Sequence, residues 1–139
     1  MSSELPVTIG EIVNKETEYK IFCSEFYVND CSGLLNIEEK HIILNKLDDS
    51  RRIRFTIAYL YSILKSNLHL IDEDEYCILK RSCCYHLDKN IYRRKAYKNA
   101  ANLLIPEQIL EKYIGEEKSV LAKIFEVPQW TFRLRKLNE

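Results

Sequence analysis

The side chains in this sequence best suited to binding chemistry are three tyrosines and two arginines: Tyr59, Tyr61, Tyr97, Arg93 and Arg94. Phenols and guanidinium groups placed together can hold an acidic peptide or a phosphate, because Arg makes bidentate contacts with oxyanions. The alternative is that the tyrosines fill interior volume, as buried tyrosines commonly do. These five residues are the candidate lining of a binding cleft, which is either an open groove or a packed plug.

A second group has the residue types of a zinc site: Cys77, Cys83, Cys84 and His86. Zinc ligands usually come as pairs with C-x-x-C-like spacing on tight turns, and two adjacent cysteines cannot easily point at one metal. Small buried thiols account for these cysteines better than a metal site does. The other two histidines, His41 and His69, have no Ser or Cys partner at motif spacing, so no catalytic triad is predicted.

Length and composition predict a single α+β domain over residues 1–139. Three glycines and three prolines are too few for a turn-rich all-β fold. Lys+Arg and Asp+Glu are equal at 21 each, which argues against a general affinity for nucleic acid or an anionic membrane. No stretch approaches about 18 apolar residues, so no transmembrane helix is expected. The five cysteines lack a framework spacing and the N-terminus lacks the features of a secretory signal, which predicts reduced thiols in a cytoplasmic protein.

The element expected to position the candidate cleft is a long helix over residues 51–68. Asp48, Asp49 and Ser50 are candidates for its N-cap. Apolar and aromatic residues cover most of its circumference: Phe55, Ile57, Ala58, Tyr59, Leu60, Tyr61, Ile63 and Leu64. A helix that is apolar on most sides is usually buried in the centre of a domain.

The segments before this helix predict a short helix over residues 7–16 and a small antiparallel sheet. Thr8 and Glu11 form a capping-box pattern at the start of the short helix. Residues 19–23 are rich in aromatic and β-branched side chains, which predicts a strand. Two apolar runs on either side of the charged turn at residues 38–40 predict a hairpin.

The segments after the central helix predict a predominantly helical body. Residues 70–89 allow a helix that would include Ile78 and Leu79. A further helix is expected over residues 90–105, and another from Pro106 at its N1 position to a C-terminal end near Gly115. Two short helices are expected over residues 117–125 and 129–137.

The segment over residues 54–63, RFTIAYLYSI, resembles the active-site helix of ImmA/IrrE-type metallopeptidases, R-F-T-x-A-H-E-x-G-H. In that HExxH motif two His at i and i+4 bind Zn²⁺, and the Glu between them is the general base. Tyr59 and Ile63 stand at the two His positions, and Leu60 stands at the Glu position. The resemblance implies a zincin-like minimal metallopeptidase frame without its metal chemistry, so no cofactor and no catalytic residue are expected.

The resemblance covers roughly residues 7–137. Residues 96–106 resemble the family's A-N-x-F-A-A-x-L-L-M-P segment, and residues 121–134 resemble its closing L-A-x-x-F-x-V and R-L pieces. The family's third metal ligand is a Glu just before the A-N pair. The candidate positions here hold Arg93, Arg94 and Lys95, and cations at these positions would repel a divalent ion.

These observations predict a catalytically inactive ImmA/IrrE-like regulatory protein that acts by binding another protein. The resemblance implies that its partner is a helix-turn-helix repressor of a phage or other mobile element. One alternative is a peptidase with a rebuilt metal site. Another is a DNA-binding regulator, because residues 119–137 have the outline of a helix-turn-helix whose second helix carries Arg133, Arg135 and Lys136. The same segment is also explained as ordinary helical closure of the domain, and the zero net charge favours this closure over DNA binding.

Overall fold

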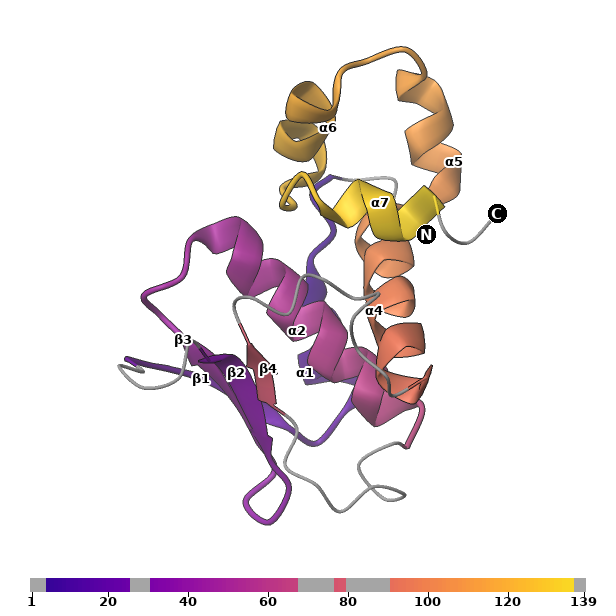
Figure 1. The fold of residues 1–139 in the computed structure, drawn as a ribbon. Helices are drawn as coiled ribbons and strands as arrows, with labels where there is room; N and C mark the ends of the chain where they lie inside the picture. The colour runs from indigo at the N-terminus through magenta and orange to yellow at the C-terminus, as the bar shows by residue number, and fades with distance from the viewer. Residues whose placement is uncertain (1–4, 26–30, 68–76, 80–90, 137–139) are drawn as a thin grey trace.

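The computed structural model describes residues 5–25, 31–67, 77–79 and 91–136 of the chain. The fold is α+β, as predicted. Figure 1 shows the sheet on one side of a central helix, α2 (Ser50–Lys65), and α4 (Ile91–Leu104) on the other side. The remaining C-terminal helices gather at one end of this layered body. Among the described residues, no helix is long and apolar enough to cross a membrane.

The sheet has four strands in the order β1-β3-β2-β4. Their bounds are β1 Lys20–Ser24, β2 Cys31–Asn36, β3 His41–Asn45 and β4 Cys77–Leu79. β2 and β3 form the expected antiparallel hairpin, but β1 pairs with β3 in parallel, so the prediction of a purely antiparallel sheet is wrong for β1. The reason is geometric. β4 occupies the other edge of β2, which leaves β1 beside β3, and two reversals of the chain give β1 and β3 the same direction.

The central helix α2 is the element that the sequence predicted best. The carboxylate of Asp49 accepts a hydrogen bond from the backbone N–H of Arg52 at 2.9 Å, which makes Asp49 the N-cap. Every residue from Phe55 to Leu64 is buried, as expected for a helix that is apolar on most sides. Gly33 lets β2 approach this helix closely, because a Cβ there would lie 2.6 Å from Thr56 Cγ2.

The other helices lie close to their predicted positions. They are α1 Ile9–Glu16, α5 Glu107–Leu110 with a 3₁₀ turn at Glu111–Tyr113, α6 Lys118–Phe125 and α7 Thr131–Lys136. Two predictions about helix starts are wrong. Thr8 occupies the N-cap of α1, but its side chain makes no capping hydrogen bond, because its backbone lies outside the β region that an N-cap usually adopts. Pro106 precedes α5 as its N-cap with extended ψ, instead of occupying N1.

Arg54 ties the C-terminal helices to α2. Its guanidinium donates hydrogen bonds to the carbonyl oxygens of Val7 at 2.6 Å, Glu126 at 2.9 Å and Phe125 at 3.4 Å. The last two carbonyls lie at the end of α6, where helices leave acceptors unsatisfied. Burial lowers the pKa of Arg54, against the opposing effect of Glu126, yet a guanidinium stays protonated under such conditions. The Arg54 side chain therefore joins α2 to the segment before α1 and to the end of α6.

Candidate functional site

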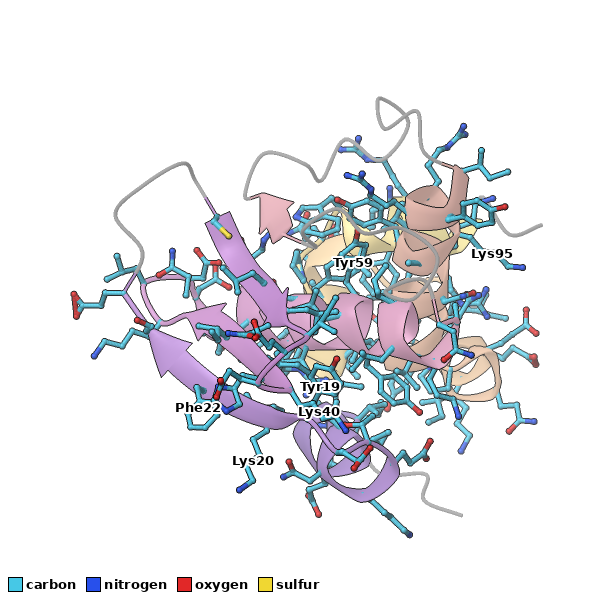
Figure 2. The ribbon with its side chains drawn as sticks, turned by 90° about the horizontal axis from the view of Figure 1, so that it is seen from below. Tyr19, Lys20, Phe22, Lys40, Tyr59 and Lys95 are labelled. Carbon is cyan, nitrogen blue, oxygen red and sulfur yellow. The ribbon has the colours of Figure 1, made fainter. Side chains whose placement is uncertain are left out.

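The three positions that the resemblance matches to the zinc motif lie in the domain core. Leu60 and Ile63 are fully buried, and Tyr59 is only 2% exposed. The Tyr59 ring packs against that of Tyr97 from α4, with the ring centroids 4.6 Å apart. Figure 2 shows Tyr59 in the interior between the sheet and α4. Aromatic packing therefore fills the place where the resemblance puts a metal ion.

This packing continues along α2 towards the C-terminal helices. Phe55 stacks on Tyr97 with centroids 6.1 Å apart, and it meets the edge of Trp130 at 4.7 Å. The guanidinium of Arg52 lies 5.3 Å from the Trp130 ring centroid, within range of a cation–π contact. Arg52 Nε also donates a hydrogen bond to Ser32 Oγ at 3.0 Å. Sequence patterns do not group Arg52 and Trp130 with the tyrosines, because the contacts with Trp130 join segments that are distant in the chain.

Tyr61 does not belong to the same cluster as Tyr59. Residues two apart on a helix point to different sides. The Tyr61 hydroxyl donates a hydrogen bond to Glu16 Oε1 on α1 at 2.6 Å, and Lys65 Nζ lies 3.5 Å from the same oxygen. Burial, together with this contact, raises the pKa of Tyr61 to about 12. The Tyr61 hydrogen bond, opposed by burial, lowers the pKa of Glu16 below its usual value.

Removing the Tyr61 hydroxyl is expected to change the dependence of stability on alkaline pH. The pKa of Tyr61 rises from 10.0 to about 12 on folding, so its contribution is complete below pH 10 and is lost as the pH rises to 12. In Tyr61→Phe this loss of folding stability between pH 10 and pH 12 should vanish. Urea denaturation between pH 9 and about 11.5 measures it, since ΔG falls linearly with denaturant. Tyr113→Phe is the control and should keep the decline. If the free energy of unfolding fell equally steeply with pH in wild type and in Tyr61→Phe, the raised pKa assigned to Tyr61 would be contradicted.

Arg93 and Arg94 lie at the start of α4, near the surface. Both are half-buried, Lys95 is exposed, and the two preceding side chains, Ile91 and Tyr92, are 68% and 55% exposed. Figure 2 shows Lys95 at the outer margin of α4, away from Tyr59. The five candidate cleft residues therefore divide into three places. Tyr59 and Tyr97 are packed in the core, Tyr61 faces α1, and the arginines are half-buried at the start of α4.

Cys83, Cys84, His86 and His69 lie outside the described residues, as does the side chain of Cys77. Within the described ranges, no group of three or more His, Cys, Asp or Glu is placed to hold a metal.

The structure does describe the other two cysteines and two of the predicted positions in β4. Cys31 is disulfide-bonded, so the prediction of reduced thiols is wrong for it, because sequence spacing does not reveal disulfide pairing. Cys23 is a free, exposed thiol. Ile78 and Leu79 lie in β4, so the helix that their pattern allowed is wrong there.

A pocket of about 300 Å³ lies among the C-terminal helices, away from the tyrosines. It is lined by Glu107, Leu110, Glu116, Lys118, Leu121, Phe132 and Arg135. Sequence reasoning missed it, because its lining comes from three short helices and the loop before α6. The helix-turn-helix interpretation assigned Arg135 to DNA. Instead, Arg135 Nε donates a hydrogen bond to the carbonyl oxygen of Ile105 at 3.1 Å, and Arg135 Nη2 lies 3.6 Å from Glu107 Oε1.

The rest of α7 is consistent with helical closure of the domain. Phe132 and Leu134 are both buried, and Arg133 is exposed. A DNA-reading helix needs several outward-facing side chains to reach base edges. Of the three basic residues assigned to that role, Arg135 bonds to Ile105 within the domain, and the side chain of Lys136 lies outside the described residues. Arg133 is therefore the one that the structure describes as exposed.

Comparison of the chain with models of known protein families finds no match, and the search of curated proteins finds none either.

Proposed function

We propose that this chain is a non-catalytic regulatory protein built on a frame like that of ImmA/IrrE-type peptidases, and that it acts by binding another protein. One observation carries the proposal. The positions aligned with the zinc ligands and the general base are packed core residues, with Tyr59 against Tyr97. A leucine and an isoleucine offer neither a metal ligand nor a proton-transfer group.

The surface that best supports protein binding is the first half of α4, which we term the α4 patch. It consists of Ile91, Tyr92, Arg93, Arg94, Lys95 and Lys98. The helix sequence IYRRKAYKNAANLL holds four cations and no carboxylate. Exposed aromatic and Arg side chains commonly supply most of the binding energy at protein interfaces. Charge complementarity therefore indicates an acidic surface on the partner. The resemblance makes a helix-turn-helix repressor the first protein to test.

Reversing one charge in the α4 patch is expected to weaken partner capture. Arg94→Glu should reduce affinity at least about tenfold, because it places a carboxylate against an acidic surface. Melting temperature should change little, since Arg94 lies near the surface. The partner is first isolated by pull-down from native cells and mass spectrometry. Its affinity for the variant is then measured by calorimetry.

Lys123→Glu is the matched control, because it makes the same charge change at an exposed position of α6. It should bind as wild type does. Equal affinity for wild type and Arg94→Glu would reject the α4 patch as the binding surface. Recovery of DNA instead of protein, with retention that falls steeply as salt rises, would favour the DNA-binding alternative over protein binding.

A further inference from the structure

Strand β1 forms one edge of the sheet and pairs on its other side with β3. The backbone N–H of Lys20 donates to Lys40 O at 3.0 Å, and Ser24 O accepts from the N–H of Lys46 at 2.9 Å. Alternate residues of a strand direct their backbone groups to the same side. Lys20, Phe22 and Ser24 therefore face β3, whereas Ile21 and Cys23 direct their N–H and C=O groups to the outer edge of β1.

Beyond Lys20 at its start, this edge lacks the features that usually prevent pairing with another chain. Sheet edges are commonly protected by a charge, a proline or a bulge. The run from Ile21 to Ser24 has neither a charge nor a proline, and all five residues of β1 pair with β3 in a regular register. The Phe22 side chain is 44% exposed and rests on the His41 ring, with the centroids 4.4 Å apart. Figure 2 shows Phe22 and Lys20 at the outer margin of the sheet.

We propose that β1 pairs in antiparallel fashion with β1 of a second copy of this chain, about a twofold axis at Phe22. In this register Ile21 lies opposite Cys23 of the second copy, and the two exchange backbone hydrogen bonds. The two Phe22 residues then form a pair without hydrogen bonds, in which Cα atoms are about 4.5 Å apart and side chains are closest. Their exposed rings meet on the same face of an eight-stranded sheet.

The charges near β1 favour a second copy in this orientation. Lys20 lies at one end of the strand pair beside the ion pair of Lys40 and Glu18, and Glu25 lies at the other end, paired with Lys46. Antiparallel pairing brings Lys20 of one copy near Glu25 of the other, whereas parallel pairing would place Lys20 against Lys20. Zero net charge removes any long-range repulsion between two copies. The sheet and α4 lie on opposite sides of α2 (Figure 1), so this dimer leaves the α4 patch open.

Cysteine cross-linking tests both the dimer and its register. In a Cys23→Ser background, Phe22→Cys puts two thiols at a Cα separation that suits a disulfide. Under mild oxidation this variant should form covalent dimers at least about tenfold faster than Val120→Cys in the same background, because pairing raises the effective concentration of the thiols. Val120 on α6 is the matched control, with 39% of its side chain exposed.

Sedimentation equilibrium of the unmodified chain supplies the independent measurement. Wild type should be dimeric at micromolar concentration, and Phe22→Lys should be monomeric with an unchanged circular dichroism spectrum. A wild type that is monomeric at all concentrations would overturn the proposal. So would cross-linking of Phe22→Cys no faster than that of Val120→Cys. Neither outcome affects the proposed function, because partner capture by the α4 patch is measured separately.

Discussion

Replacing Ala58 with aspartate is expected to destabilise the fold by about 4 kcal/mol or more, a large share of the stability of a domain this size. Ala58 is fully buried on α2, which packs between the sheet and α4. A carboxylate there would lose its hydration without gaining a partner, and it would also need space that a close-packed interior does not provide. Urea denaturation followed by circular dichroism measures the loss.

Ser50→Asp is the matched control for this variant. Ser50 is the exposed first residue of the same helix, where a negative charge interacts favourably with the helix dipole. Its stability should equal or slightly exceed that of wild type. If Ala58→Asp and Ser50→Asp unfolded at the same urea concentration, α2 would not be the buried centre of the domain, and the assignment of the fold would fail.

The sequence predicted the helices well because each one is a local pattern. The broad apolar surface of residues 51–68 indicated a buried helix, and α2 is central and buried. The hairpin of β2 and β3 followed from two apolar runs around a charged turn. The parallel pairing of β1 could not be predicted, because periodicity shows neither which edge of a hairpin a strand joins nor its direction. The missing side-chain cap at Thr8 likewise depends on local dihedral angles.

The candidate site was predicted less well than the fold. The family resemblance grouped the tyrosines along a former active-site cleft, whereas the structure separates Tyr61, bonded to Glu16, from the pair of Tyr59 and Tyr97. Contacts between distant segments decided this division. Helical spacing held one usable signal, since Tyr59 and Tyr61 are two residues apart and cannot face the same neighbour. The roles of Arg52 and Arg54 also depend on distant segments, at Trp130 and at the end of α6.

The second large expected effect concerns metal content, which distinguishes a packed core from a working peptidase site. A zinc peptidase holds about one Zn²⁺ for each chain, bound by three protein ligands and a water. The positions aligned with the ligands and the base hold Tyr59, Leu60 and Ile63, and the candidates for the third ligand are Arg93, Arg94 and Lys95. Tyr59 is packed against Tyr97, so its hydroxyl alone would have to replace a complete ligand set.

The most direct test of this account is elemental analysis of the chain purified without chelator and dialysed against zinc-containing buffer. We predict a zinc content far below one ion for each chain, and the same value for Tyr59→Phe, which keeps the aromatic ring but removes the hydroxyl. Near-stoichiometric zinc in wild type that is lost in Tyr59→Phe would contradict the account, because α2 would then hold a metal where we place core packing.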